Sequence, residues 1–208
     1  MIELLTADTP NGKKISIMLE EINFEYKVTK VNLYKEEQFK PEFKRLSPFK
    51  KIPVVIDHDA NKTLFESGAI LMYLGEKSGM FYNKDQRLEI NQWLMGQMAY
   101  VGPMLGQHHQ FHHYNPGKSE FGERRYFKIA TQIYKDLDER LEVSKFLAGK
   151  DFTIADIATF PWIARHEWHD IGLKNYKNLS RWYVDISDRE AVIKGYDLMK
   201  SGEKIPKV

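Results

Sequence analysis

The sequence predicts a two-part fold, a small α/β domain over residues 1–80 followed by an all-helical domain over residues 86–208. Two observations lead to this prediction. Within the first part, the apolar period switches repeatedly between the alternation typical of strands and the i, i+3, i+4 spacing typical of helices. Beyond Met80 the helical spacing persists and strand alternation does not return, which predicts helices packed on helices.

The first domain is predicted to run strand, helix, strand, helix, strand, strand, helix. Apolar residues recur at i, i+3, i+4 and i+7 over residues 15–22, the stripe of an amphipathic helix. Alternation over residues 26–31 and a β-branched run over residues 53–57 predict two strands. Weaker patterns complete the order with a strand at 2–5, a polar helix at 35–46, a strand at 63–65 and a helix ended by Gly79.

The second domain is predicted to be a bundle of helices. A helix over residues 90–101 is expected to kink at Pro103. The apolar stripe of a second helix, from about Glu120, includes Phe127. Further features are a capping-type spacing from Thr153 to Asp156, an apolar helix behind it, and later helices over 179–184 and 191–199.

Composition excludes several classes of function. The chain has no cysteine, which excludes disulfide scaffolds, thiolate zinc sites and cysteine nucleophiles. Lys and Arg number 31 against 29 Asp and Glu, and no basic run occurs, so we expect no nucleic-acid partner. No apolar run is long enough to cross a membrane and no signal peptide is recognised, so we expect a cytoplasmic protein without a membrane partner.

Several motifs together resemble a known family. They are Thr-Pro-Asn-Gly at 9–12, Gln-Phe-Lys-Pro-Glu-Phe at 38–43, Lys-Ile-Pro-Val at 51–54, Leu-Phe-Glu-Ser-Gly-Ala-Ile at 64–70, Gly-Pro-Met-Leu-Gly-Gln at 102–107, Phe-Thr-Ile-Ala-Asp-Ile-Ala at 152–158 and Pro-Trp at 161–162. Over nearly its whole length the chain resembles a bacterial glutathione transferase, closest to the Nu class of disulfide-bond reductases. The resemblance implies a thioredoxin-like first domain of βαβαββα order, glutathione as co-substrate and a homodimer.

Glu66 and Ser67 are candidates for binding the γ-glutamyl end of glutathione. Ser67, at a helix N-terminus, offers its hydroxyl and backbone N–H to the carboxylate, where the helix dipole favours an anion. Glu66 is suited to the amine. The alternative for Ser67 is a plain N-cap without a ligand.

Ile52 and Pro53 are candidates for binding the middle of the tripeptide. The resemblance implies a cis peptide bond before Pro53, which turns the Ile52 backbone outward to pair antiparallel with the ligand's cysteinyl backbone. The alternative is a trans proline that begins an edge strand. Gln38 and Lys51 are candidates for the glycyl carboxylate, with solvated surface as their alternative.

Thr9 and Asn11 are candidates for activating the glutathione thiol. Other transferase classes use a Tyr or Ser hydroxyl or a Cys, but here Tyr26 is on the second predicted strand and Ser16 is inside the first helix. Thr9 and Asn11 remain, just before a helix whose positive end also favours a thiolate. The alternative for Asn11 is an N-cap of that helix.

The missing cysteine also constrains the mechanism. If the protein reduces disulfides, every sulfur arrives with a ligand, so one glutathione attacks the disulfide and a second resolves the mixed species. The resemblance implies such a two-glutathione site and places Arg125 at a glutathione contact in the helical domain. The alternative for Arg125 is a surface ion pair with Glu123 or Asp136.

Four histidines cluster at residues 108, 109, 112 and 113. In a helix they form two i, i+4 pairs, but the pairs point in different directions and no carboxylate completes a set, so we predict no metal site. We expect the segment to line the cleft for the second substrate, with a solvated polar face as the alternative for two of the four histidines. A noncatalytic binding or regulatory protein on the same scaffold is the alternative to the enzyme, distinguished by calorimetric titration with glutathione.

Overall fold

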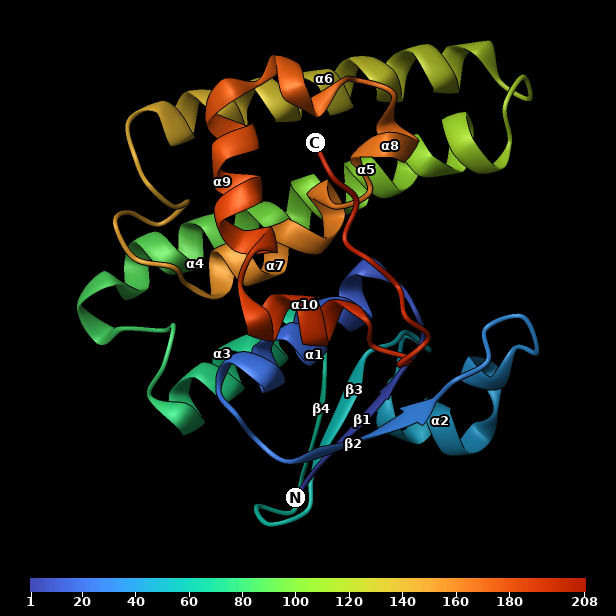
Figure 1. Ribbon diagram of the computed structural model, residues 1–208. Coiled ribbons are helices and arrows are strands. Elements are labelled where there is room, and N and C mark those ends of the chain that lie inside the picture. Colours follow the sequence, from blue (N-terminus) through green and yellow to red (C-terminus); the bar gives the residue numbers. More distant parts are fainter. The chain divides into compact units, whose positions relative to one another are not determined.

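The computed structural model of the protein describes residues 1–208 (Figure 1). The chain forms two compact units, Met1–Tyr82 with Glu190–Lys204, and Asn83–Arg189 with Ile205–Val208. The first boundary lies close to the expected end of the α/β domain at residue 80. Residues 190–204, however, belong to the first unit and not to the helical domain expected over residues 86–208.

The first unit is built on a four-stranded mixed sheet in the order β2-β1-β3-β4. β1 (Ile2–Thr6) is parallel to β2 (Tyr26–Lys30) and antiparallel to β3 (Val54–Asp57), which pairs antiparallel with β4 (Lys62–Phe65). Three helices, α1 (Pro10–Glu21), α2 (Pro41–Leu46) and α3 (Ser67–Ser78), complete the predicted order, and the thioredoxin-like fold is confirmed.

One predicted helix of this unit, over residues 35–46, is divided. A 3-10 turn at Glu37–Phe39 precedes α2, and Lys40 between them is extended, with φ −62° and ψ 145°. Pro41 explains the division because it has no N–H and disfavours helical backbone in the residue before it.

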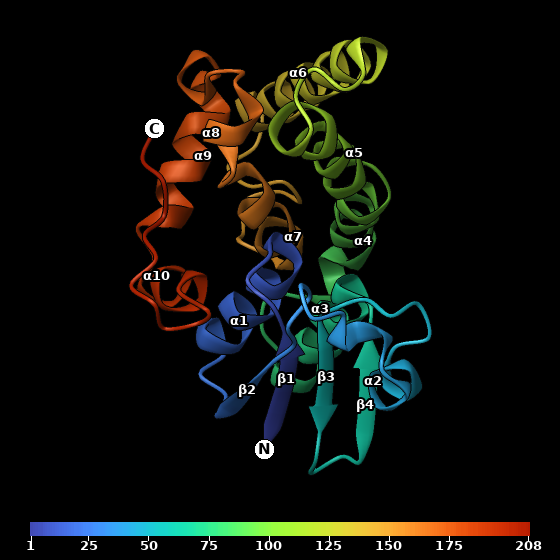
Figure 2. The ribbon, with the colours of Figure 1, turned by 90° about the vertical axis from the view of Figure 1, so that its right-hand side faces the viewer.

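The sheet carries a core on each face. Successive side chains of β1 point to opposite faces, so Leu4, paired with Val55, lies opposite to Leu5, paired with Val54. Leu5 and Val54 pack with Phe43 of α2. Figures 1 and 2 show α1 and α3 together along one side of the sheet, with α2 apart from them beside β4.

The C-terminal segment joins the first unit because α10 (Glu190–Tyr196) packs closely against α1. A Cβ at Gly195 would lie 2.5 Å from the Cα of Ile17, so only glycine allows this approach. The buried Lys13 donates from Nζ to the carbonyl of Tyr196 at 2.8 Å and also contacts the carboxylate of Glu203. Helical periodicity shows that this segment is a helix but not which element the helix packs against, so the sequence placed it in the other domain.

The second unit is all helical. Pro103 lies in the first turn of α5 (Gly102–His108) and is preceded by a π-helical turn, Gln97–Val101, at the place where we expected a kink. Proline cannot donate to the carbonyl four residues earlier, and a wider turn accommodates that loss. The helices are α4 (Arg87–Gly96), α5 (Gly102–His108), α6 (Glu120–Glu142), α7 (Ile154–Ile163), α8 (His166–His169) and α9 (Lys177–Ser187).

The core of this unit is organised around α7, which is buried almost throughout. Its first turn has the predicted capping box between Thr153 and Asp156. The predicted stripe of α6 is buried from Ala130 onward, but Phe127 is 39% exposed, so its assignment to the core was wrong. No helix in the structure combines the length and apolar character needed to cross a membrane.

Candidate functional site

Three connections of the first unit converge at one edge of the sheet. Leu5 near the end of β1 pairs with Val54 at the start of β3, and Val54 pairs with Phe65 at the end of β4. The residues that follow β1, precede β3 and follow β4 therefore meet at this edge. They include the predicted site residues Thr9, Asn11, Lys51, Ile52, Pro53, Glu66 and Ser67.

The connection after β1 presents Thr9 and Asn11 at the start of α1. Thr9 is the N-cap, and its Oγ1 accepts from the N–H of Gly12 at 3.1 Å. Asn11 is therefore not the N-cap, so the alternative that we considered for it was wrong. The Thr9 hydroxyl uses its oxygen in capping and keeps its hydrogen as a donor.

Close packing places this turn against the strand. A Cβ at Gly12 would lie 2.4 Å from Oγ1 of Thr6 and 2.5 Å from the carbonyl oxygen of Ala7. Only a residue without a side chain lets α1 start so near to the end of β1. Pro10 occupies the first turn, where its missing N–H costs nothing.

The connection before β3 has a cis peptide bond between Ile52 and Pro53. The Ile52 N–H and C=O take part in no hydrogen bond within the protein, whereas Val54 is already paired in the sheet. Ser47 fixes the approach, since its Oγ accepts from the N–H of Lys51 at 3.1 Å and donates to the Lys51 carbonyl at 2.9 Å. The trans alternative for Pro53 was wrong.

The connection after β4 places Glu66 and Ser67 at the N-terminus of α3. Glu66 is the N-cap residue and makes no side-chain capping bond, so Ser67 is the first helical residue and not the plain N-cap of our alternative. The backbone of Glu66 has φ 68° and ψ 112°, a strained conformation for a residue with a side chain. Uncapped N–H groups at a helix start favour an anion.

Lys14 lies against this N-terminus, and the sequence did not single it out. It is buried in α1, and its Nζ donates to the Oγ of Ser67 at 3.3 Å. Burial lowers the pKa of Lys14 to about 7, although Glu66 acts to raise it. A signal was present in the sequence: Lys14 lies four residues before Met18, on the apolar stripe of the helix, where a lysine is unusual.

Gln38 and Lys51 differ in exposure. The Oε1 of Gln38 is buried and has no hydrogen-bond partner within the protein, which is uncommon for a buried polar atom. The side chain of Lys51 is exposed and its main chain is held by Ser47. Both residues belong to the first unit, Gln38 in the turn before α2.

Arg125 lies on α6 in the second unit and is exposed. It pairs with neither Glu123 nor Asp136, so the surface ion pair that we considered is absent; Glu123 instead accepts from the N–H of Gly117 at 2.6 Å. The adjacent Arg124 contacts Glu120 at 3.4 Å.

The sheet edge therefore suits an extended zwitterionic peptide. It offers an anion site at Ser67, a carboxylate for an amine at Glu66, and an unpaired backbone donor and acceptor at Ile52. Hydrogen-bond donors at the start of α1 complete a site for a developing anion, and the chain itself has no thiol.

Comparisons with known proteins agree with this geometry. Family models described as "Glutathione S-transferase, N-terminal domain" and "Glutathione S-transferase, C-terminal domain" match residues 3–76 and 113–190. The "Disulfide-bond oxidoreductase YfcG" of Escherichia coli (strain K12) is 42% identical over 208 residues, covering 97% of this chain and 96% of the relative. The chain belongs to the glutathione S-transferase family.

Solved structures of other glutathione transferases are also similar. One from Burkholderia graminis, with two glutathione molecules bound per subunit, has a TM-score of 0.91 and 36% identity, covering 97% of this chain and 89% of that one. One from Pseudomonas putida, with one glutathione disulfide bound per subunit, has a TM-score of 0.88 and 38% identity, covering 95% and 91%. These relatives confirm the predicted transferase fold.

The histidine segment of this transferase is largely internal. His108 and His109 are buried, and the Nε2 atoms of His109 and His169 are 2.8 Å apart. The Nδ1 of His169 is 2.6 Å from the Tyr134 hydroxyl, and the Nε2 of His108 contacts the His169 carbonyl at 2.9 Å. The segment therefore supplies core side chains at these two positions, whereas His112 is half-buried and His113 is exposed. No group of three or more potential metal ligands is present.

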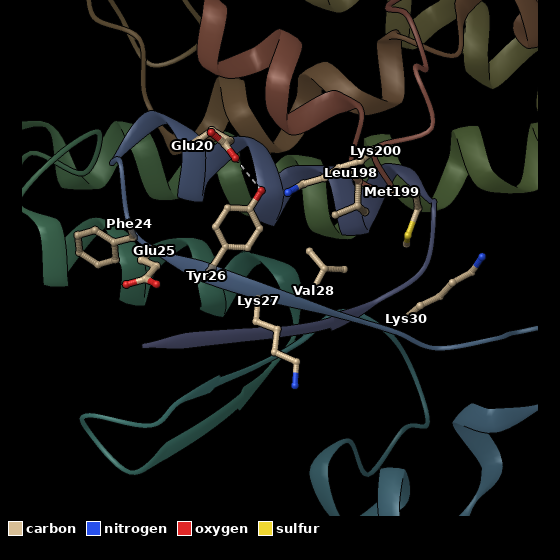
Figure 3. A pocket seen from close by; sticks show the side chains of 10 residues that line it. All are labelled: Glu20, Phe24, Glu25, Tyr26, Lys27, Val28, Lys30, Leu198, Met199 and Lys200. Atoms are coloured by element: carbon tan, nitrogen blue, oxygen red, sulfur yellow. Dashed lines mark hydrogen bonds between the residues drawn. The ribbon is translucent and has the colours of Figure 1, made fainter.

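The transferase also has a hollow of about 750 Å³ beside β2 (Figure 3). It is bordered by the end of α1, by β2 and by residues after α10, and none of the predicted site residues lines it. Within it the hydroxyl of Tyr26 donates to Glu20 at 2.8 Å, the contact drawn in Figure 3. Five of its ten lining residues are lysines or glutamates and the other five are apolar or aromatic, which is ordinary surface composition.

Proposed function

We propose that this protein is a glutathione-dependent disulfide-bond oxidoreductase that also conjugates glutathione to small electrophiles. The observation that supports this proposal best is the convergence of Thr9 and Asn11, the unpaired Ile52 backbone, and the α3 N-terminus at one sheet edge of a cysteine-free chain. Relatives named as disulfide-bond oxidoreductases, and relatives with glutathione bound, support the same function.

Glutathione binds along the edge in an extended conformation. The γ-glutamyl carboxylate accepts from Ser67 at the start of α3, and Glu66 binds the γ-glutamyl amine. The cysteinyl backbone pairs antiparallel with Ile52, whose orientation is set by Pro53. Gln38, Lys51 and Arg125 are the proposed contacts for the remaining polar groups of the tripeptide.

Thr9 and Asn11 stabilise the thiolate. A thiol with a pKa of about 8.5 is only ~3% ionised at pH 7, whereas a pKa of about 6.5 gives ~76%, a difference of about 2.7 kcal/mol. The Thr9 O–H, the Asn11 amide and the positive end of α1 are donors and dipoles of the required sign. Thr9 performs this role while its oxygen caps the helix.

The sulfur chemistry balances with two glutathione molecules. The first thiolate attacks the substrate disulfide, forms a mixed disulfide with one half and releases the other half as a thiolate, which takes up a proton. A second glutathione thiolate attacks the glutathione sulfur of the mixed disulfide, and glutathione disulfide and the second substrate thiol leave. In conjugation, the same thiolate forms a thioether with an electrophilic carbon and displaces its leaving group.

We further propose a cytoplasmic homodimer. Reduced glutathione is the reactant, and the cytosol keeps its glutathione pool reduced. Phe49 is 66% exposed and makes an edge-to-face contact with Phe65, with 6.3 Å between ring centres, which provides an apolar patch suited to a protein partner. Light scattering of the purified protein is expected to give twice the mass of the chain, and the single-chain mass would disprove the dimer.

The function is tested by assaying two reactions with the wild type and Asn11→Ala. We expect glutathione-dependent reduction of a small dialkyl disulfide to exceed conjugation of an aromatic halide. Asn11→Ala is expected to lower kcat/KM in both by about 10- to 100-fold, the usual effect of losing a hydrogen bond to a charged atom. Ultraviolet absorbance of the bound thiolate should show a raised glutathione pKa in the variant.

Asn175→Ala, at an exposed position in the other unit, is the matched control and should keep wild-type rates. Full activity of Asn11→Ala would show that another group activates the thiol. Absence of glutathione binding to the wild type in calorimetry at millimolar ligand would favour a noncatalytic protein.

A further inference from the structure

Lys14 is a buried residue of the first unit whose ammonium group contacts the expected γ-glutamyl site. Only 1% of its surface is exposed, and its Nζ lies 3.3 Å from the Oγ of Ser67. An ammonium group has donors only, so Ser67 accepts in this bond and its own hydrogen is donated elsewhere. Lys14 thus restricts the direction in which Ser67 donates.

Lys13, the preceding residue, is a buried lysine with a structural role. Lys13 has a carboxylate oxygen of Asp8 and the carbonyl of Tyr196 each at 2.8 Å, contacts Glu203, and lies 4.0 Å from the centre of the Tyr196 ring. Its charge is therefore compensated by groups of the segments around it, consistent with a role in holding α10.

Lys14 faces the other side of α1, towards α3. The carboxylate that acts on it is Glu66, which is exposed, while Asp8 and Glu203 are engaged by Lys13. Burial outweighs the effect of Glu66, so the pKa of Lys14 is lowered to about 7. Burying a cation costs free energy, and charged groups held in the interior concentrate at sites that bind charge.

We propose that Lys14 is a positioning residue for the free carboxylate of the γ-glutamyl group, and that it acts through Ser67. The inference rests on the proposed glutathione site. The ligand carboxylate accepts from the Ser67 hydroxyl, which Lys14 orients, and the buried ammonium stabilises the same anion through the hydroxyl in a low-dielectric interior. Lys14 thereby makes the site selective for γ-glutamyl peptides that carry this carboxylate.

A pair of ligands isolates the proposed interaction. S-methylglutathione has the carboxylate but no thiol, so neither turnover nor thiolate formation affects its binding. Its analogue with a 4-aminobutyryl group in place of γ-glutamyl lacks only that carboxylate. Calorimetric titration of both ligands is carried out with wild type, Lys14→Met, Lys14→Gln and Lys14→Arg, so that one uncharged variant remains if the other fails to fold.

The uncharged variants are expected to bind S-methylglutathione at least ~10-fold more weakly than wild type and to bind the analogue within about twofold of wild type. Lys14→Arg keeps the charge and is expected to keep most of the discrimination. The ligand-free uncharged variants are expected to unfold at a temperature no lower than wild type, because the desolvation cost of a buried charge has been removed.

Lys13→Met is the matched control, since it removes an equally buried neighbouring lysine. It is expected to unfold at a lower temperature and, while folded, to keep the wild-type discrimination between the two ligands. Equal weakening of both ligands by Lys14→Met and Lys14→Gln, or equal behaviour of the Arg, Met and Gln variants, would overturn the assignment. Failure of the wild type to bind S-methylglutathione would instead disprove the proposed function.

Discussion

At the residue scale, the four residues at positions 9–12 have four separate functions. Thr9 caps α1 and keeps a hydroxyl hydrogen as a donor, while Pro10 starts the helix without losing a hydrogen bond. Asn11 does not cap the helix, because Thr9 is the N-cap residue. Gly12 lets the helix approach the end of β1. In the proposed site, Thr9 therefore offers its hydroxyl hydrogen and Asn11 its amide to the ligand thiolate, while the oxygen of Thr9 caps the helix.

Gly12→Ala tests this division of tasks. Its Cβ would meet the Oγ1 of Thr6 and the carbonyl oxygen of Ala7 within 2.5 Å, and a backbone atom cannot rotate away. We expect a loss of about 1–3 kcal/mol in unfolding free energy, as for other overpacked sites, and a fall in kcat/KM for glutathione as Thr9 and Asn11 shift. Thermal unfolding and steady-state kinetics measure the two effects.

Gly96→Ala provides the comparison for this prediction. Gly96 ends α4 in helical conformation with nothing within 4 Å of its added Cβ, so alanine should be neutral or stabilise by about 0.5–1 kcal/mol. If Gly12→Ala and Gly96→Ala had the same effect, close approach at Gly12 would not be the reason for that glycine.

At the element scale, the helical segment from Gln97 to Tyr114 departs most from its prediction. Two π-helical turns flank α5, one before Pro103 and one over the histidines. The extra residue in a π turn changes which side chains share a face. His108 and His109 lie in the core, whereas an α-helical register had suggested two i, i+4 pairs that point in different directions and a segment that lines a cleft.

Asp156 is a buried capping residue that bonds to three segments of the second unit. Its buried carboxylate accepts from the N–H groups of Leu147 and Thr153, the Thr153 hydroxyl and the Trp182 indole, at 2.9 to 3.1 Å. Burial raises its pKa even though these hydrogen bonds act to lower it. One side chain thus joins α7, the preceding loop and α9.

Asp156→Ala is expected to destabilise the helical unit by at least about 3 kcal/mol, because each buried donor left without a partner costs about 1–3 kcal/mol. Chemical unfolding followed by circular dichroism measures this. Asp151→Ala, an exposed aspartate five positions earlier, should change stability by less than about 0.5 kcal/mol. A loss below 1 kcal/mol for Asp156→Ala would mean that the four bonds add little.

At the scale of the whole molecule, the chain returns to its first unit near its end. Two features hold α10 against α1: Gly195 allows the close approach of the two helices, and the buried Lys13 donates to the carbonyl of Tyr196.

The second unit contains a cluster of buried histidines. Burial lowers the pKa of His109 to about 3, lowers that of His169 well below its usual value, and also lowers that of His108.

This cluster predicts that the protein loses stability in mild acid. Below pH ~6.5 histidines bind protons in the unfolded chain but not in the core, so unfolding free energy falls with falling pH. Each such histidine contributes a slope of up to about 1.4 kcal/mol per pH unit, which for His109 continues down towards pH 3. Thermal unfolding measured from pH 8 to pH 5 should show a falling midpoint.

His109→Gln removes one of these groups and is expected to make the midpoint less dependent on pH below 6.5, whatever its effect at pH 8. The slope, rather than the absolute midpoint, is the quantity to compare. An unchanged slope would show that His109 already takes up a proton in the folded protein.

The sequence by itself determined the order of strands and helices in the first unit, the capping box of Thr153 and Asp156, and the absence of a protein thiol. These follow from periodicity and side-chain chemistry, which act over a few neighbouring residues. The motif residues of the candidate site were recognised through the family resemblance that the motifs carry. Lys14 was not recognised, because its partner Ser67 lies 53 positions away.

Only the tertiary structure decided which side chains became buried and which distant groups meet. The placement of α10 beside α1, the internal position of His108 and His109, and the contact of Lys14 with Ser67 all depend on pairs far apart in the chain. Helical periodicity assigns a face to each residue but not the neighbour that covers it, so these features follow from packing and the desolvation it imposes.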